Sequence, residues 1–391
     1  MSEQQIEAER RASDLLERAR RVRAVAARHA DDVDREARFP REAAEALRKE
    51  KLLSAHVPRE YGGEGATLED LVMICAELGR GCTSTAMAYA MHQIQVGCIL
   101  RHGQSSEWYR AYLRDLCEKE LLIASATSEL GVGGDLRTSK CAVESNGSGF
   151  RLEKQASVIS YGEYADEILV TARRNPDAAP GDQVLVLVRK ADYTLEKVGG
   201  WDTLGMRGTC SNGFVLRSHG VPEQILPVPF AEIASATMVA YSHVLWTGAW
   251  LGVGTEAVSR ARKFIQGEAR KTPGKMPPGA LRLAEVTSKL HALRATVEDG
   301  RREYEKRLGN PDQLESFGFV VRMNDLKIAT SELLVQVVHG CLGTIGIAAY
   351  RNDTKFSMGR ILRDAYGAVL QINNDRMYGT NAQLLLMTRE D

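Results

Sequence analysis

The sequence predicts an α+β fold, and three successive changes of pattern along its 391 residues carry that prediction. Apolar residues recur near helical spacing over 1–122, form short strand-like runs between glycines over 123–231, and return to long helical patterns over 232–391. Strands and helices therefore do not alternate, which argues against a doubly wound nucleotide-binding sheet. We expect one domain in each of the three ranges.

The N-terminal part is expected to be helical throughout. Phe39-Pro40 opens one of its helices, because proline suits a first helical turn. A loop rich in proline and glycine follows at 57–63, and Thr67 is placed to cap the next helix. A further long apolar helix is expected over 84–100.

Strand character in the middle part is clearest in three apolar runs, at 150–152, 167–172 and 183–188. Four long helical patterns follow from about residue 232, at 237–265, 281–308, 317–345 and about 359–387. The most apolar stretch, 333–350, contains Gln336, His339 and glycines. It therefore indicates a buried helix of a bundle and not a membrane span.

Composition excludes several classes of function. Fifty-one Lys and Arg residues balance 51 Asp and Glu residues, so no basic surplus favours a nucleic acid partner. The seven cysteines form no C-x-x-C pair and the histidines are scattered, which indicates reduced thiols and no metal site. The N-terminal residues mix acids and bases and include no apolar segment, so we expect a cytoplasmic protein without a targeting signal.

A glycine-rich loop opens the middle part and is the first candidate binding element. Hydroxyl side chains at Ser125, Thr127 and Ser128 precede three glycines within Gly131–Gly134. Successive backbone N–H groups in such a loop can bind an anion such as a pyrophosphate. An ordinary turn explains the same glycines, so the loop alone leaves both interpretations open.

With its flanks, this loop resembles a known flavoprotein family. Phe39-Pro40 with Ala55-His-Val-Pro-Arg-Glu-Tyr-Gly-Gly63 resembles the "fP … vPeeyGG" stretch of the acyl-CoA dehydrogenases, and 128–135 resembles their "TEpgaGSD" flavin loop. Three further matches follow in the same order. They are 157–162 for "WITNG", Leu204-Gly-Met-Arg-Gly-Thr-Cys-Ser211 for "lGmrgS", and Leu362-Arg-Asp-Ala365 for "RDa". The resemblance spans nearly the whole chain.

This resemblance implies a middle β-barrel or sandwich, a C-terminal four-helix bundle, and FAD bound between them in a homotetramer or dimer. It also implies an acyl thioester substrate and an electron-transfer protein as partner. The residues that it places at the flavin are Ser125, Thr127, Ser128, Gly133, Gly134, Ser160 and Asn374. Gly343 and Gly346 would line the flavin of a neighbouring subunit, and Arg270 would replace the arginine with which the family grips that flavin.

The catalytic base of the family is missing from its usual positions. The family removes an α-proton with a glutamate, but this chain has Ile372 at the usual position and Ser242 at the alternative one. Glu129, His243 and Asp375 are the candidate substitutes. Each also has an ordinary structural interpretation: a loop cap for Glu129, a buried core histidine for His243, and an ion-pair partner for Asp375.

Three functions follow from this pattern. We favour α,β-dehydrogenation of an acyl thioester with a displaced base. The alternative is a monooxygenase on the same fold that receives reduced flavin from a separate reductase and needs no such base. Arg363-Asp-Ala365 with Asn374-Asp375 resembles that branch. A flavoprotein that has lost catalysis is the third possibility.

Overall fold

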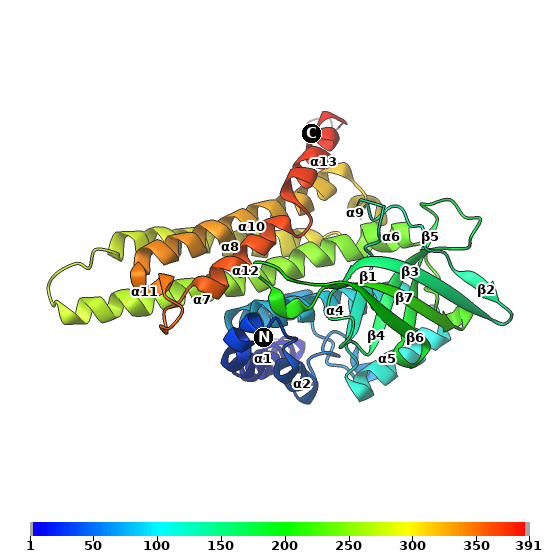
Figure 1. Ribbon diagram of the computed structural model, residues 1–391, viewed down its shortest axis with the longest axis horizontal. Coiled ribbons are helices and arrows are strands. Elements are labelled where there is room, and N and C mark those ends of the chain that lie inside the picture. The colour runs from blue at the N-terminus through cyan, green and yellow to red at the C-terminus, as the bar shows by residue number, and fades with distance from the viewer. Residues whose placement is uncertain (1–2, 134, 388–391) are drawn as a thin grey trace.

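The computed structural model describes residues 3–133 and 135–387, which form helical, β-rich and helical parts in that order (Figure 1). The N-terminal helices are α1 (Glu3–Arg35), α2 (Arg41–Lys49), α3 (Leu68–Gly81), α4 (Thr83–His102) and α5 (Glu107–Lys119). Thr67 caps α3 as predicted. Its hydroxyl accepts a hydrogen bond from the Asp70 N–H at 3.2 Å, and the Asp70 carboxylate accepts one from the Thr67 N–H at 2.8 Å.

Among the described residues of the middle part, seven strands form two separate sheets. They are β1 (Ile123–Ala126), β2 (Glu144–Asn146), β3 (Gly149–Ile159), β4 (Glu167–Arg173), β5 (Gln183–Arg189), β6 (Tyr193–Gly199) and β7 (Asn212–Gly220). The first sheet has the order β1-β4-β5, with β1 parallel to β4, and the second has the order β2-β3-β7-β6. Nearly every residue of β4 and β5 is buried, which explains why these strands are continuous apolar runs.

The C-terminal part is a bundle of long helices. A short helix, α6 (Phe230–Ile233), and a π-helical turn over Ala234–Met238 precede α7 (Val239–Lys271). The remaining helices are α8 (Ala280–Glu305), α9 (Pro311–Leu314), α10 (Phe317–Ile345), α11 (Ile347–Tyr350), α12 (Gly359–Leu370) and α13 (Asn374–Met387). α10 is long and apolar enough to cross a membrane, but it packs against α7, α8, α12 and α13 as the core helix of the bundle.

The prediction of one helix over 359–387 is wrong. The chain turns between α12 and α13 at Gln371–Asn373, where Ile372 has a positive φ of 51°. The side chain of Asn373 accepts a hydrogen bond from the Asp375 N–H at 2.8 Å, so it starts α13 in the way that an N-cap residue does. Asparagine competes with the helix for such backbone groups, and apolar periodicity does not reveal that competition.

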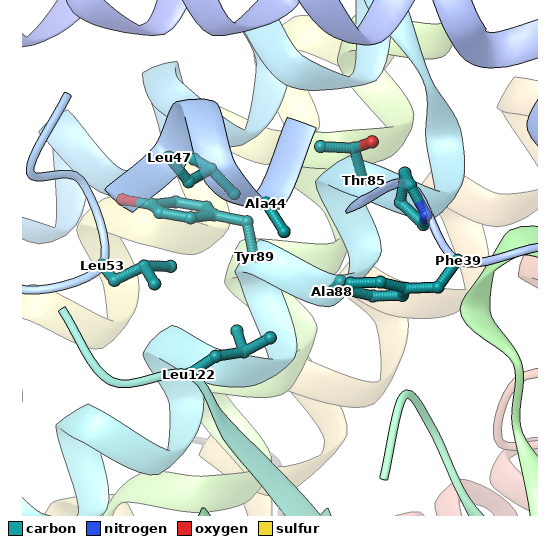
Figure 2. A pocket seen from close by; sticks show the side chains of 9 residues that line it. Phe39, Ala44, Leu47, Leu53, Thr85, Ala88, Tyr89 and Leu122 are labelled. Atoms are coloured by element: carbon teal, nitrogen blue, oxygen red, sulfur yellow. The ribbon is translucent and has the colours of Figure 1, made fainter. Parts of the chain in front are cut away.

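Two hollows in this fold are defined by their lining residues. Figure 2 shows a small one between α2, α4 and the start of the β region, lined by apolar groups such as those of Phe39, Leu47 and Leu122. Its volume is about 10 Å³, which is at most the space that one water molecule needs. It therefore cannot hold a cofactor. The other hollow lies at the far tip of the bundle and is described below.

Candidate functional site

Two hydroxyl groups, those of Ser125 and Thr127, lie at the end of β1, where the glycine-rich loop begins. Ser125 and Thr127 are two residues apart along the extended chain at the end of β1, so their side chains lie on the same face. Both residues are half-buried, and neither hydroxyl makes a hydrogen bond within the described residues. These two hydroxyls are therefore free to bind a ligand that enters at this edge of the sheet.

Ser128, in contrast, fastens the loop to the second sheet. Its hydroxyl donates to the Val158 carbonyl at 2.8 Å and accepts from the Val158 N–H at 3.3 Å. Both bonds together fix the loop against the end of β3. Val158, which aligns with the tryptophan of the "WITNG" stretch that 157–162 resembles, remains 36% exposed beside it. The Ser128 hydroxyl is thus a positioning group more than a free ligand-binding group.

Ser160 ends a chain of three hydroxyl groups. Its Oγ lies 2.8 Å from Ser211 Oγ, which lies 2.9 Å from Thr209 Oγ1, and Thr209 donates to the Met206 carbonyl at 2.9 Å. A hydroxyl has one proton to donate. Since the Thr209 hydroxyl donates its one proton to the Met206 carbonyl, Ser211 must donate to Thr209 and Ser160 must donate to Ser211. Ser160 therefore offers acceptor lone pairs to an N–H group of a ligand.

The glycine-rich loop is also held by the C-terminal bundle. Gly133 has a φ of +61°, and a Cβ atom there would meet no neighbouring atom within 4 Å, so its surroundings are open. The Gly133 carbonyl accepts a hydrogen bond from Arg376 Nη1 of α13 at 3.1 Å. The prediction for Gly134 falls on a residue outside the described part of the chain.

Glu129 lies in a buried ion pair instead of facing an open site. Its carboxylate is 3.1 Å from Lys154 Nζ and accepts hydrogen bonds from Ser139 Oγ at 2.7 Å and from the Cys141 N–H at 2.7 Å. Burial alone would raise the pKa of this carboxyl group, but Lys154 and these donors outweigh burial and lower it. All of these partners bind the ionised carboxylate, so Glu129 stabilises the fold and its carboxylate is not free to act as a base.

His243 and Asp375 occupy opposite environments. His243 is buried on α7, and burial together with the charge of Lys327 lowers its pKa to about 3. An imidazole with that pKa is a weak proton acceptor. Asp375 lies in the first turn of α13, is exposed, and adjoins Arg376. Of the three candidate bases, only Asp375 has a carboxylate that is not engaged with other described residues.

The two glutamate positions of the family contain no carboxylate. Ile372 lies at the corner between α12 and α13 and is 39% exposed. Ser242 is buried on α7, and its hydroxyl donates to the Met238 carbonyl at 2.6 Å, one helical turn earlier. Neither side chain can accept a proton from carbon at neutral pH.

Gly343 and Gly346 line a groove at the far tip of the bundle. The groove measures about 480 Å³ and is also lined by Arg282 and Glu285 of α8. Arg282 Nη1 donates to the Gly343 carbonyl at 3.0 Å, and Gly346 has a φ of +73° between α10 and α11. Figure 1 shows this junction at one end of the long helices and the strands at the other end. The groove and the glycine-rich loop of one chain therefore cannot form a single site.

Asn374 and Arg270 complete the set of predicted residues. Asn374 is buried in the first turn of α13, where its side chain bonds to Lys327 and Ser331 of α10. Arg270 is exposed near the end of α7 and has no partner within the described residues. The structure thus brings Ser125, Thr127, Ser128, Ser160 and Gly133 to one region and leaves Arg270 with the distant tip.

Comparison with known proteins shows which families and structures this chain is similar to. Residues 11–120 match the family described as "Acyl-CoA dehydrogenase, N-terminal domain". A protein named "Probable acyl-CoA dehydrogenase fadE25" from Mycobacterium leprae is 26% identical over 359 residues, which cover 88% of each chain. Residues 11–120 therefore match the N-terminal domain of the acyl-CoA dehydrogenases, and most of the chain is similar to proteins with that name. The fold and the flavin-dependent oxidoreductase class predicted from the sequence are thereby confirmed.

Other proteins to which the chain is similar carry different names. L-evernosamine nitrososynthase from a Micromonospora species is 29% identical over 351 residues, covering 86% of this chain and 80% of that protein. The FMN-bound structure of TdsC from Paenibacillus sp. A11-2 superposes with a TM-score of 0.82 at 18% identity, covering 98% of each chain. TdsC is described as a dibenzothiophene monooxygenase. At this identity, the likeness to TdsC shows the fold alone.

Several residues of the site escaped the sequence analysis. Arg376 lies outside the quoted motifs, and its contact with Gly133 depends on how the bundle meets the β region. Thr209 and Ser211 lie within the stretch 204–211 that resembles "lGmrgS", but their hydroxyl contacts depend on how that stretch folds against Ser160. Lys327 is different, because it is, with Arg322, one of two Lys and Arg residues within the apolar pattern of 317–345. Such a residue seldom lies fully buried without hydrogen-bond partners. That anomaly was a usable signal.

Proposed function

We propose that this protein is a monooxygenase that uses reduced flavin and O₂. One oxygen atom would enter the substrate and the other would leave as water, while the reduced flavin supplies two electrons and is oxidised. The observation that carries the proposal is the state of the candidate bases. Ile372 and Ser242 occupy the glutamate positions, Glu129 is paired with Lys154, and His243 has a pKa of about 3. Oxygen transfer from flavin requires no proton to be removed from an α-carbon.

The flavin itself fits the residues at the sheet edge. Ser125 and Thr127 offer free hydroxyls, Ser160 offers acceptor lone pairs, and the open backbone at Gly133 leaves room for a ligand. When bound, the flavin supplies the redox chemistry, and these residues bind and orient it. Ser128 and Arg376 hold the loop in place, and Val158 is the side chain exposed next to it.

Dehydrogenation of an acyl thioester is the second candidate function. It is favoured by the similarity to the protein named as an acyl-CoA dehydrogenase from Mycobacterium leprae. In this case Asp375 would be the base, because it is exposed in the first turn of α13, beside the glycine-rich loop to which Arg376 is bonded. Its partner would be an electron-transfer protein in place of a flavin reductase.

We further propose that the cofactor is FAD and that the protein is a homotetramer. The groove at Gly343 and Gly346 is large enough for an adenine nucleotide, and it lies too far from the glycine-rich loop of its own chain to serve it. A neighbouring subunit would bring the two halves together. Exposed Ile347 and Tyr350 on α11 give that tip an apolar surface suited to contact with another chain. A reducing, cytoplasmic location is supported by the seven free thiols.

The deciding experiment supplies flavin in two ways. In the first, a separate reductase and NADH provide reduced FAD or FMN, and ¹⁸O₂ is supplied with a panel of nucleotide-linked amino sugars and aromatic heterocycles. Incorporation of one ¹⁸O atom into a product, seen by mass spectrometry, is the expected result. In the second, the oxidised holoprotein is mixed with acyl-CoA thioesters without oxygen. Loss of the oxidised flavin absorbance there would reject the monooxygenase and support dehydrogenation.

A further inference from the structure

Lys327 is a fully buried cation on α10 that the proposed chemistry does not use. Its side chain is 0% exposed. Its Nζ donates to the Ile372 carbonyl at 2.7 Å and to Asn374 Oδ1 at 2.6 Å, and it lies 6.0 Å from the centre of the Trp250 ring. Lys327 forms no ion pair within the described residues. Both acceptors belong to the corner between α12 and α13, so its charge is directed at that corner.

The corner needs an anchor because its backbone is strained. Ile372 has a left-handed φ of 51°, which is unfavourable for a β-branched side chain. Its side chain is partly exposed and gains little from burial. The hydrogen bond from Lys327 to the Ile372 carbonyl therefore helps to hold this peptide in place, and the bonds of Lys327 and Ser331 to Asn374 fix the start of α13.

The same corner connects both loops of the β region that carry candidate flavin ligands. After the corner, Arg376 of α13 donates to the Gly133 carbonyl at 3.1 Å. Before it, the buried carboxylate of Asp364 on α12 accepts from the Met206 N–H at 2.7 Å. Met206 in turn accepts from Thr209 in the hydroxyl chain that ends at Ser160. The two helices that meet at the corner thus contact both loops, and the glycine-rich loop is held from the α13 side.

We propose that Lys327 is a positioning residue for flavin binding, which anchors the α12–α13 corner so that Arg376 holds the glycine-rich loop in its binding shape. This inference rests on the flavin site that the proposed function uses. It concerns binding of the cofactor and is independent of which reaction follows. Lys327 acts through Ile372, Asn374 and Arg376, and it is not itself a ligand of the flavin.

The test measures flavin affinity by quenching of flavin fluorescence, using FAD and FMN as probes. We expect Lys327→Met to weaken binding about tenfold, the loss that one charge-assisted hydrogen bond can cause. Arg376→Gln, a surface change that leaves the bundle intact, should weaken binding similarly. The double variant should be little weaker than either single one, because both act through one corner. Lys263→Met, at an exposed lysine on α7, is the matched control and should bind as wild type does.

A rescue variant separates positioning from general damage to the fold. Glycine adopts a positive φ without strain, so Ile372→Gly in the Lys327→Met background should recover part of the affinity and of the visible circular dichroism of bound flavin. Wild-type affinity in Lys327→Met, or additive losses in the double variant, would overturn the inference. A wild-type protein that binds flavin but transfers no oxygen would instead reject only the proposed function.

Discussion

At the residue scale, the two buried lysines of the described chain are stabilised in different ways. Lys154 lies against the Glu129 carboxylate at 3.1 Å and also donates to Thr171. Lys327 has only neutral oxygen atoms as hydrogen-bond partners. A buried charge costs free energy unless it is paired, and a paired one becomes costly when its partner is removed. The two sites therefore predict different responses to mutation and to pH.

Glu129→Gln should destabilise the protein without removing a catalytic group. The change leaves the Lys154 ammonium buried without its counter-ion, so we expect the free energy of unfolding to fall by about 3 kcal/mol in urea denaturation. Adding Lys154→Met should recover much of that loss, since the uncompensated charge disappears. Turnover per bound flavin should stay near the wild-type value. Loss of turnover in a stably folded Glu129→Gln protein would show that Glu129 is a base after all.

Lys327 should make stability depend on pH in the alkaline range. Burial lowers the pKa of its ammonium group from about 10.5 to about 8 in the folded protein. Between these values the unfolded chain binds more protons, so the free energy of unfolding contributed by this group rises from pH 8 to pH 10.5. This gain in stability disappears as the pH falls from about 10.5 to about 8. Nearby His243 stays neutral over this range, because burial lowers its pKa to about 3.

Lys327→Met removes that titration. We expect its curve of unfolding free energy against pH to be flatter than the wild-type curve over this interval, when both are measured by chemical denaturation. Lys263→Met is again the control, because its exposed lysine should leave the slope unchanged. Parallel curves for wild type and Lys327→Met would show that the buried lysine keeps an ordinary pKa.

At the element scale, the contact between α3 and α7 depends on small residues. A Cβ atom at Gly252 of α7 would lie 2.0 Å from the Ala76 carbonyl oxygen, and one at Gly79 of α3 would lie 2.2 Å from the Ala249 carbonyl oxygen. Such distances lie far inside van der Waals contact, so a side chain would push the helices apart. This close contact fixes α7, the helix that carries Ser242 and His243, against the N-terminal part.

Gly252→Ala and Gly267→Ala form a matched pair on α7. We expect Gly252→Ala to destabilise the protein by about 1–3 kcal/mol, as overpacked cores do. At Gly267 a Cβ atom would meet nothing within 4 Å, so alanine there should stabilise the helix by up to about 1 kcal/mol. Thermal and urea unfolding of both variants measure the difference. Equal effects of the same sign would mean that α3 and α7 are not in close contact.

Elements with strong periodicity could be predicted from the sequence, and elements set by single side chains could not. The pattern over 317–345 matches α10, and the apolar runs at 167–172 and 183–188 match β4 and β5. The turn at Ile372 was not predicted because it depends on two side chains. Asn373 lies within a pattern that reads as helical, and Lys327 lies 45 residues earlier in the sequence. In the candidate site, hydroxyls and glycines were found by motif. The ion pair that occupies Glu129 could not be predicted in this way, because its partner Lys154 lies in β3 and not in the loop that contains Glu129.

At the scale of the whole molecule, the two halves of the proposed cofactor site lie at opposite ends of the folded molecule. The glycine-rich loop lies with the strands, and the groove of Gly343 and Gly346 lies at the tip of the bundle (Figure 1). A site built from both needs two copies of the chain, each giving one half to the other. Symmetric assemblies allow this exchange, because every interface patch recurs on each copy.

Complementation between two inactive variants tests this arrangement. Gly133→Glu places a carboxylate on the backbone that would face the flavin phosphates, at a φ that side chains disfavour. Gly343→Glu places a carboxylate in the groove. The Cβ atom of the new side chain would lie 2.9 Å from Arg282 Nη1, so its carboxylate can neutralise that arginine. Each variant alone should lose FAD.

A mixed pair contains one chain of each variant. One of its two sites then combines the altered loop with the altered groove, and the other site combines the intact loop with the intact groove. Coexpression should therefore restore about a quarter of the wild-type FAD content if the chains assort randomly in pairs. Retention of FAD by Gly343→Glu alone, or failure of the mixture to recover any, would mean that each chain binds its flavin by itself.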